Sequence, residues 1–314
     1  MKSSARLTIG TRGSPLALAQ AELVRRALAA ACPELAEPDA VAVRVIRTSG
    51  DRFVDRPLTE IGGKGLFTKE IEEALLTGTI DIAVHSMKDM PTELPAGLEI
   101  AACLPRADPR DAMIGPADTG LAELPSGAVI GTASLRRAAQ VRAQRPDLRI
   151  VNLRGNVQTR LRKVKSGEIA ATFLAAAGLQ RLGLLQEATR LLDAEEMLPA
   201  VAQGAIGIEA RSGDDPTLDF LARIDHLDTR LCIEAERVFL AALDGSCRTP
   251  IAALCELTEG SVRFRGLLAE PDGGCLQRVQ LRGEAGAAPI LAREAASMLR
   301  SGASRYGGAG EGGG

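Results

Sequence analysis

Apolar and polar positions alternate along the chain with two different periods, and the changes of period mark the first elements. Short, mainly apolar runs at 6–10, 41–48 and 80–85 predict strands, the last of them buried on both faces. The longer segments 15–30 and 68–76 predict helices, the first with a proline in its opening turn. This order of strand, helix and strand predicts α/β layers.

The opening motif of the chain occurs a second time. The sequence IGTRGS (9–14) is matched by IGTAS (130–134), and each copy follows a short apolar run and leads into a predicted helix. After the second copy the pattern predicts a strand at 149–153, a helix at 157–166 and a buried strand at 172–176. We interpret the two copies as two domains of similar construction.

The last third of the chain has a different pattern. Residues 199–210, which contain the glycine-rich sequence QGAIGIEA, predict a return crossing between the domains. The elements predicted after it are a helix at 229–243, antiparallel strands at 262–268 and 275–281, and a final helix at 288–301. A smaller α+β domain is therefore expected from near residue 227.

Composition limits the class of protein. Of the 314 residues, 46% are hydrophobic but only 2% are aromatic, so the cores must be built from Leu, Ala, Val and Ile. The length favours two or three domains. Few aromatic rings are available for base stacking, and the net charge is −2 with a pI of about 5.9, so we expect no binding of nucleic acid.

Signals for metal, membrane and secretion are weak. The chain has two His and six Cys with no CxxC pair, so we expect no metal site. No run of 18 apolar residues predicts a membrane helix, and the first 14 residues lack the apolar stretch of a signal peptide. We therefore expect a cytoplasmic protein with reduced thiols.

Arginine density is the strongest chemical signal. Eight arginines fall within 27 residues, namely Arg136, Arg137, Arg142, Arg145, Arg149, Arg154, Arg160 and Arg162. A solvated helix face explains most charge runs, and we expect it to explain half of this one. The four that fit this explanation are Arg142, Arg145, Arg149 and Arg162.

The other arginines stand at the ends of predicted elements. Arg136 and Arg137 begin a helix, where the helix dipole disfavours a cation unless an anion is present. Arg154 ends a strand, at the edge where open α/β sheets bind ligands. Because the planar fork of arginine makes two hydrogen bonds to one carboxylate, we expect a carboxylate-rich ligand.

Two further features suggest chemistry at strand ends. The hydroxyl residues in the repeated turns either bind an anion beside a helix start or simply cap the helix, and the sequence leaves both open. Asp89 follows a buried strand in HSMKD (85–89). It either pairs with Lys88 or acts beside a cationic or N–H-bearing reaction centre.

Cys247 is the best candidate for a nucleophile or an attachment point. It lies in a glycine-containing turn beside Arg248, where a thiolate is favoured and accessible, whereas the other cysteines considered fit inert packing. The sequence GGKG (62–65) lacks the spacing of a phosphate-binding loop. We therefore expect a glycine-hinged lid there and no nucleotide site.

Several motifs together resemble one family. They are IGTR (9–12), GGKGLF (62–67), DIAVHSMKDMP (81–91), DPRDA (108–112), GTASLRR (131–137), LRGNVQTRL (153–161), AAGLQRLGL (176–184), LPAVAQGAIGIE (198–209) and GSCRTPI (245–251). This set resembles the porphobilinogen deaminase (hydroxymethylbilane synthase) family over about 250 residues and more loosely over the last 60. Ala133, Ala170 and Glu60 depart from the family pattern, and Ala133 removes one hydroxyl donor.

The resemblance implies an α/β fold of three domains. Two would resemble the lobes of a type II periplasmic binding protein, and the third would be a small α+β C-terminal domain that carries the cofactor. The implied ranges are 1–104 with 205–222 for domain 1, 105–204 for domain 2, 227–306 for domain 3 and 307–314 for a disordered glycine-rich tail.

The resemblance also implies an activity in tetrapyrrole (heme) biosynthesis. Four porphobilinogen molecules would be polymerised into linear hydroxymethylbilane, with loss of ammonia, on a dipyrromethane cofactor joined by a thioether to Cys247. Asp89 would be the catalytic residue. The residues implied to hold the cofactor are Lys88, Thr132, Ser134, Arg136, Arg137, Arg154 and Gly155. Those implied to contact porphobilinogen and the growing polypyrrole are Arg12, Ser14, Arg154, Arg160, Arg181 and Gln203.

Two other functions remain as alternatives at this point. A cytosolic two-lobed protein that binds anions without catalysis would share the architecture, but it does not need Cys247. An RNA-binding protein would need aromatic residues or a basic domain, and the chain has neither. We expect a monomer whose partners are porphobilinogen and the growing polypyrrole, with no nucleic acid and no membrane.

Overall fold

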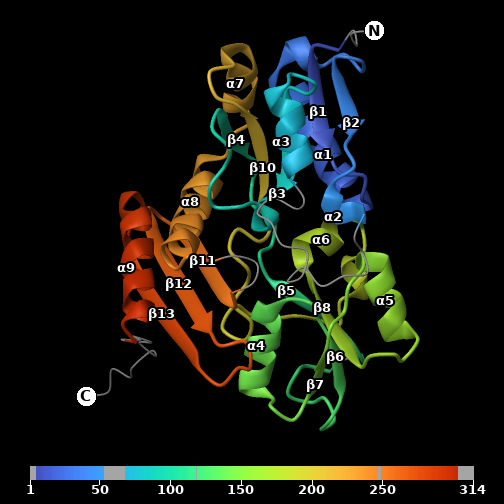
Figure 1. The fold of residues 1–314 in the computed structure, drawn as a ribbon, viewed down its shortest axis with the longest axis vertical. Helices are drawn as coiled ribbons and strands as arrows, with labels where there is room; N and C mark the ends of the chain where they lie inside the picture. The colour runs from blue at the N-terminus through green and yellow to red at the C-terminus, as the bar shows by residue number, and fades with distance from the viewer. Residues whose placement is uncertain (1–4, 53–67, 118, 246–248, 303–314) are drawn as a thin grey trace.

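The computed structural model describes residues 5–52, 68–117, 119–245 and 249–302. These residues form two five-stranded sheets and one three-stranded sheet, each with its own helices (Figure 1). The predicted fold class is confirmed: the protein is α/β, with two sheet-rich lobes and a small C-terminal domain.

Lobe 1 is built on the first sheet. Its strand order is β2 (Val41–Val45), β1 (Leu7–Thr11), β3 (Ile82–Ser86), β10 (Ile206–Arg211) and β4 (Leu98–Cys103). Its helical segments are α1 (Pro15–Ala31), η1 (Pro33–Leu35), α2 (Ser49–Arg52), α3 (Lys69–Leu76), η2 (Met87–Asp89) and α7 (Asp215–Ala222). The face of α1 that carries Ala21, Val24 and Leu28 at helical spacing is fully buried in the core of this lobe.

Lobe 2 is built on the second sheet. Its strand order is β7 (Arg149–Val151), β6 (Val129–Gly131), β8 (Ala171–Ala175), β5 (Asp111–Ile114) and β9 (Arg190–Leu191). Its helical segments are α4 (Leu135–Gln144), α5 (Val157–Lys165), α6 (Ala176–Arg181) and η3 (Leu185–Glu187). Phe173 on β8 and Met113 on β5 are fully buried in its core.

The two lobes repeat one topology. In the spatial order of each sheet the second strand lies between two parallel neighbours, β1 between β2 and β3, and β6 between β7 and β8. The fourth strand, β10 in lobe 1 and β5 in lobe 2, is antiparallel to its neighbours. The internal repeat predicted from IGTRGS and IGTAS is therefore confirmed, and it lies at β1–α1 and β6–α4.

Two crossing segments join the lobes. The chain leaves lobe 1 through residues 104–110 and returns through residues 192–205, which agrees with the return predicted at 199–210. The two segments are hydrogen-bonded to each other: Leu104 N–H donates to the Ile206 carbonyl over 3.1 Å, and Ala107 N–H to the Gly204 carbonyl over 3.2 Å. They therefore act as one paired connection between the lobes.

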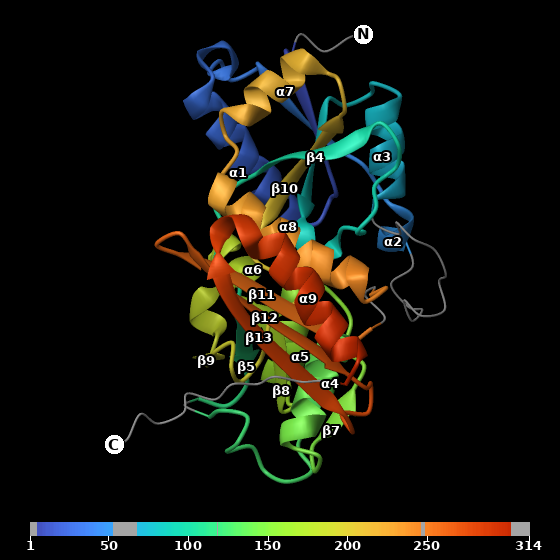
Figure 2. The ribbon, with the colours of Figure 1, turned by 90° about the vertical axis from the view of Figure 1, so that its left-hand side faces the viewer.

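The third domain is an antiparallel sheet covered by helices on one face. Its strands are β11 (Ile251–Thr258), β12 (Ser261–Ala269) and β13 (Leu276–Glu284), followed by η4 (Ala285–Ala287), and its helices are α8 (Leu227–Ala242) and α9 (Ala288–Arg300). In Figure 2 α9 crosses in front of the sheet and lobe 2 lies behind it. On that side Leu254 and Leu267 pack against Ala139 of α4. The sheet is therefore buried on both faces.

One buried carboxylate ties the third domain to both crossing segments. Glu236 of α8 is fully buried and pairs with Arg106 of the outgoing segment, with Oε1 at 2.6 Å from Nη1 and Oε2 at 3.1 Å from Nη2. Its oxygens also accept from the N–H groups of Ala202 on the return segment (2.6 Å) and Cys255 on β11 (2.8 Å). Four donors on one carboxylate fix these parts relative to each other.

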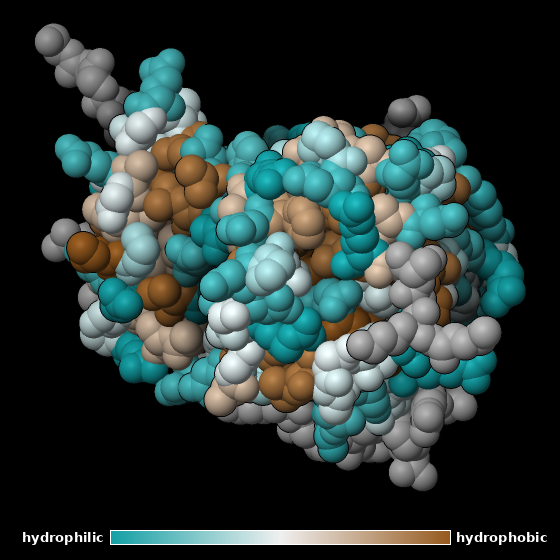
Figure 3. Space-filling model, turned by 90° about the horizontal axis from the view of Figure 1, so that it is seen from above, coloured by the Kyte–Doolittle hydropathy of each residue, from teal (hydrophilic) through white to brown (hydrophobic). Residues whose placement is uncertain are grey.

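The surface above lobe 1 carries apolar side chains in small separate groups between polar ones (Figure 3). Exposed apolar residues of lobe 1 include Leu18, Leu23, Val43 and Val45. Such scattered residues are ordinary on protein surfaces and do not by themselves mark a binding site.

Candidate active site

Asp89 is held out into solvent by two buried methionines. It ends η2 directly after β3, and its side chain is exposed. Met87 and Met90 on either side are 2% and 5% exposed and pack into the core of the third domain. Met87 N–H also donates to the Ala205 carbonyl of the return segment over 3.1 Å. The position of Asp89 therefore depends on lobe 1, the third domain and the crossing.

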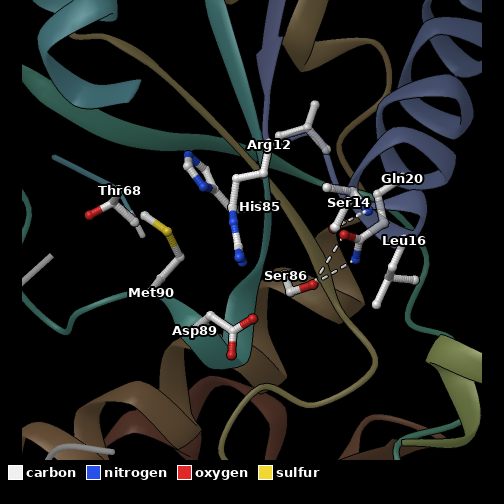
Figure 4. Close-up of a pocket in the computed structure, with 11 residues that line it drawn as sticks. Arg12, Ser14, Leu16, Gln20, Thr68, His85, Ser86, Asp89 and Met90 are labelled. Atoms are coloured by element: carbon white, nitrogen blue, oxygen red, sulfur yellow. Dashed lines mark hydrogen bonds between the residues drawn. The ribbon is translucent and has the colours of Figure 1, made fainter. Parts of the chain in front are cut away.

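A pocket of about 70 Å³ opens beside Asp89 (Figure 4). The predicted substrate residues Arg12 and Ser14 line it together with Asp89. Residues that the sequence did not single out as contacts also line it, among them Gln20, Thr68, His85 and Ser86. Gln20 is buried and hydrogen-bonded to Ser86 over 2.8 Å. The sequence carried one signal that could have found this pocket, a glutamine on the apolar face of α1, but the sequence analysis did not use it.

The hydroxyls of the two repeated turns cap helices. Ser14 Oγ accepts from Ala17 N–H over 3.2 Å at the start of α1, and Ser134 Oγ accepts from Arg137 N–H over 3.4 Å at the start of α4. Thr132 is buried and accepts from Ser134 N–H over 3.1 Å. The capping explanation, left open by the sequence, therefore holds for both turns, and whether the same hydroxyls also donate to an anion stays a prediction.

Arg136 and Arg137 contact an anion of the protein itself. Both are 5% exposed, and both bond the fully buried Asp111 at 2.7 Å, Arg136 through Nη1 to Oδ2 and Arg137 through Nη2 to Oδ1. The two guanidinium groups hold the pKa of Asp111 far below its usual range, against the opposing effect of its burial. The anion that the helix start requires is thus Asp111, which the sequence analysis missed although it lies in the DPRDA motif.

The two arginines keep some capacity for other contacts. Arg136 Nη1 also donates to the Leu198 carbonyl and Arg137 Nη1 to the Phe173 carbonyl, each over 2.7 Å. The Nε atoms of both are buried and lack a hydrogen-bond partner among the described residues. Their predicted contact with the cofactor remains a prediction, and they also have a structural role at the centre of lobe 2.

Arg154 and Arg160 lie beside Arg137 and make the region strongly cationic. Both are half-buried, and Arg160 Nε donates to the Gly155 carbonyl over 3.0 Å. Burial and then the charges of Arg137 and Arg154 lower the pKa of Arg160 to about 10. Gly155 has φ +117°, and a side chain there would collide with Thr159, so this turn requires glycine.

Lys88 connects the two lobes electrostatically. The Lys88 side chain is half-buried, with its amine enclosed by the protein. This burial lowers the pKa of Lys88 to about 8. Asp89 opposes this shift, while Arg137 and Arg136 add to it. Because Lys88 belongs to lobe 1 and these arginines to lobe 2, the predicted cationic residues of both lobes converge on one region next to Asp89.

Arg181 and Gln203 lie at the crossing. Arg181 Nη2 donates to the Gly204 carbonyl over 2.6 Å, and burial lowers its pKa to about 10. Gln203 Nε2 donates to Asp111 Oδ1 over 2.9 Å and to the Pro109 carbonyl over 2.8 Å. The amide nitrogen of Gln203 therefore supports the Asp111 cluster, and the predicted substrate contacts of both residues remain predictions.

The four arginines expected to be surface charge make structural or solvent contacts. Arg149 and Arg162 are exposed. Arg145 donates to the carbonyls of Leu121, Ala122 and Leu124. Arg142 donates to the Pro271 carbonyl of the third domain.

Some predictions concern residues or ions that the structure does not place. Cys247 lies outside the described residues, as do Glu60 and the GGKG segment. Within the described ranges, no group of three or more His, Cys, Asp or Glu side chains is arranged to hold a metal ion. None of the helices there is long and apolar enough to cross a membrane.

Comparison with known proteins settles the family. A family model described as "Porphobilinogen deaminase, dipyromethane cofactor binding domain" matches residues 7–219, and another described as "Porphobilinogen deaminase, C-terminal domain" matches residues 230–301. The chain belongs to the porphobilinogen deaminase family. The predicted family, enzyme class and dipyrromethane cofactor are thereby confirmed, and the protein is an enzyme of tetrapyrrole biosynthesis.

Individual relatives in this family are similar over most of their length. The chloroplastic porphobilinogen deaminase of rice (Oryza sativa subsp. japonica) is 57% identical over 88% of this chain and 78% of its own. That of Nitrobacter winogradskyi is 55% identical over 93% of this chain and 92% of its own, and that of Paracoccus denitrificans 54% identical over 94% and 93%.

Solved structures with a partly similar backbone fold were also found. One is a YaeC-family lipoprotein of Enterococcus faecalis V583, with 16% identity, a TM-score of 0.42, and coverage of 71% of this chain and 92% of that one. Another is the periplasmic aliphatic sulphonate binding protein SsuA of Escherichia coli, with 15% identity, a TM-score of 0.40, and coverage of 76% and 70%.

Proposed function

We propose that this enzyme joins four porphobilinogen molecules into linear hydroxymethylbilane, with release of ammonia, on a dipyrromethane attached through a thioether to Cys247. We further propose that it acts as a cytoplasmic monomer that binds neither nucleic acid nor membrane. The observation that supports the activity most directly is the match of residues 7–219 to the cofactor-binding domain of the family. Asp89, the acid that lines the pocket, lies next to the cationic residues.

The charge of the site fits the proposed cofactor. Each pyrrole ring of a dipyrromethane carries an acetate and a propionate, so the group brings four carboxylates. The low pKa of Arg160 is partly caused by repulsion from Arg137 and Arg154, and bound carboxylates would relieve this repulsion. Each charge-assisted hydrogen bond contributes roughly 1.5–3 kcal/mol. Several arginines are therefore needed to hold so charged a group.

The residues that would hold the cofactor come from both lobes. They are Lys88, Thr132, Ser134, Arg136, Arg137, Arg154 and Gly155, and when bound the group supplies the ring carbon at which the chain grows. Arg12, Ser14, Arg154, Arg160, Arg181 and Gln203 would surround the incoming porphobilinogen and the growing chain. In Figure 4 the Arg12 side chain extends from β1 down toward Asp89, which suits a substrate carboxylate held beside the reacting carbon.

Asp89 would act by charge and by proton transfer. Loss of the amine from porphobilinogen leaves a cationic, N–H-bearing ring, and an exposed carboxylate fixed between two buried methionines stabilises that charge without moving. The same carboxylate would accept the proton lost when the new carbon–carbon bond is completed. The rival function, anion binding without catalysis, gives Asp89 and Cys247 no role.

The attachment at Cys247 is tested by intact mass. We expect purified protein to exceed the mass of its sequence by two pyrrole units, and Cys247→Ser to have the sequence mass and no activity. Cys275, which is exposed on the third domain, supplies the matched control, because Cys275→Ser should keep the extra mass. An unmodified protein with full activity would refute the proposed attachment.

The role of Asp89 is tested by Asp89→Asn. We expect this variant to fold normally and to consume porphobilinogen at least about 100-fold more slowly, since general acid–base and electrostatic contributions are of that order or larger. The control is Glu93→Gln, a nearby charge outside the pocket. Near-normal consumption by Asp89→Asn would remove Asp89 from the mechanism.

A further inference from the structure

A buried acidic cluster lies behind the pocket. His85 on β3 and Glu209 on β10 are joined by a hydrogen bond of 2.9 Å between Nε2 and Oε2, and their side chains are 6% and 0% exposed. Glu72, from α3, is 8% exposed and lies close enough to both for its pKa to depend on their charges. Three elements of lobe 1 thus bring two carboxylates and one imidazole together out of contact with solvent.

The carboxylates of this cluster are short of partners. Oε1 of Glu209 and Oε1 of Glu72 are buried, and neither has a hydrogen-bond partner within the described part of the chain. Buried acceptors without donors are costly, so the cluster favours an additional proton. Burial, together with repulsion from Glu209, raises the pKa of Glu72, although the charge of His85 opposes this shift.

Three other charged groups lie near the cluster. Arg237 of α8 is close enough to Glu209 to feel its charge, but its Nη2 donates to the carbonyls of Pro91 and Thr92, over 2.7 and 3.2 Å. Arg12 and Asp89 face the imidazole from the pocket side. Glu209 is therefore the one carboxylate hydrogen-bonded to His85 in the described structure.

His85 connects this cluster with the reaction site. Its side chain lines the same pocket as Asp89, in which about 70 Å³ is enough to hold water (Figure 4). Glu209 bonds one ring nitrogen, Nε2, which fixes the orientation of the imidazole. This is the arrangement by which a carboxylate prepares a histidine to exchange protons.

The proposed condensation of porphobilinogen releases a proton, which a group of the site must accept. In each condensation the carbon–nitrogen bond of the incoming porphobilinogen breaks, and the electron pair leaves with the ammonia. A carbon–carbon bond forms, and the acceptor carbon loses its hydrogen as a proton while its electron pair returns to the ring. The ammonia is formed before this proton is lost, so a base of the site must accept the proton from the carbon and pass it to the ammonia, which then leaves as ammonium.

We propose that His85 is a further acid–base residue of this site, which takes the proton from Asp89 across the pocket and passes it to the released ammonia. Glu209 is its positioning residue, and Glu72 is the second buried carboxyl group of the cluster. This inference rests on the proposed function.

The first experiment observes His85 directly in the holoenzyme. The chain has only two histidines, so carbon-13 labelling of the rings gives two sets of NMR signals, and His226→Asn assigns them. On addition of porphobilinogen during turnover we expect the His85 signals to move toward the positions of imidazolium, while those of His226 stay unchanged. His85 signals that do not respond to turnover would overturn the proposal, and this test needs no variant of the cluster.

The second experiment compares Glu209→Gln and His85→Gln with wild type. We expect kcat to fall about 10- to 100-fold with KM within about twofold, and the dependence of kcat on pH to change shape. Glu99→Gln is the matched control, since Glu99 is exposed on the neighbouring strand β4, where it pairs with Ala210. A loss of kcat equal at every pH, or none, would give His85 and Glu209 a purely structural role.

The two proposals fail in different ways. If wild-type holoenzyme does not consume porphobilinogen, the proposed function is wrong, and this inference falls with it. If wild type consumes porphobilinogen and the two variants match it, only the role of His85 is wrong.

Discussion

Single residues of the arginine-rich segment have three different roles, and burial separates them. Arg136 and Arg137 are buried against Asp111, so removing any member of this trio leaves an uncompensated charge inside lobe 2. Arg154 and Arg160 are half-buried next to Arg137, and burial followed by the charges of Arg137 and Arg154 lowers the pKa of Arg160. The remaining arginines of the segment bond backbone carbonyls or face solvent.

Asp111→Asn should therefore destabilise the protein strongly. It leaves two buried guanidinium groups without their counter-charge, which costs about 3–5 kcal/mol in the free energy of unfolding. Asp108→Asn is the control, because its partner Arg110 is 37% exposed and such pairs contribute about 1 kcal/mol or less. Urea unfolding measures both, and equal losses would contradict the importance we give to burial.

Substitution of Arg136 or Arg137 has to be interpreted with the same pair in mind. The sequence alone led us to expect that a leucine at either position blocks cofactor assembly and leaves folding intact. The bonds to Asp111 add a cost in folding to this expectation. Cofactor loading should therefore be measured on the fraction that is folded.

Lys88 should make anion binding depend on pH. Its pKa in the folded protein is about 8, lowered from 10.5 by burial, so the ammonium is present below about pH 8 and is lost as the pH rises through this value. KM for porphobilinogen should then rise between about pH 7 and about pH 9, and Lys88→Arg, which keeps its charge, should flatten this rise. Identical pH profiles of KM for the two proteins would refute this role of Lys88.

At the scale of elements, the turn after β3 and the two crossing segments control the geometry of the site. Met87 and Met90 anchor η2 in the core of the third domain, so a short turn of lobe 1 is positioned by a different domain. In the return segment the Ala205 carbonyl accepts from the same turn, and the single Gly204 carbonyl accepts from both Ala107 N–H and Arg181 Nη2. A small displacement of the crossing segments should therefore change the position of Asp89.

Gly204→Ala tests this connection. Gly204 has φ +92°, and a side chain would collide with the Ala107 carbonyl of the outgoing segment, so we expect a loss of at least about 2 kcal/mol and a lower kcat. Gly127→Ala is the matched control: its φ is +76°, but nothing lies within 4 Å of the added atom. The free energy of unfolding and the turnover of both variants should be measured. Equal losses in the two variants would mean that backbone strain at a positive φ, and not the contact with Ala107, is the cause.

At the scale of the whole molecule, the two lobes and the third domain are joined through Glu236 and the crossing segments. Glu236 receives donors from the outgoing segment, the return segment and β11, and its side chain is fully buried. The third domain also packs on α4 of lobe 2 and on the turn that carries Asp89. The molecule is therefore expected to unfold cooperatively.

Glu236→Gln should weaken this junction. It removes the counter-charge of Arg106, whose side chain is 12% exposed, and should cost about 3 kcal/mol. Glu234→Gln on the same helix is the control, since Glu234 is 57% exposed. Calorimetry should show unfolding of Glu236→Gln at a lower temperature and over a broader range than unfolding of wild type. An unfolding curve like that of wild type would contradict the proposed role of Glu236 in joining the domains.

Local sequence patterns were sufficient for much of the fold. The helix at 15–30 agrees with α1 to one residue, and the strand at 6–10 with β1 to one residue, because burial imposes a clear period on both. The short strands β5 and β9 were missed, since four and two residues show no period and β5 carries the charged Asp111. The motif with Asp89 was found because an acid directly after a buried strand is unusual.

The sequence by itself determined the family, the layered class of the fold and the repeat of the lobes, and it predicted which residues bind carboxylates. Only the tertiary structure decided which of these cations already have a partner in the protein, because Asp111 and Arg137 are 26 positions apart and are brought together by packing. The pairing of His85 with Glu209, 124 residues apart, has the same origin. Local periodicity specifies elements, whereas burial of charge is a property of the assembled core.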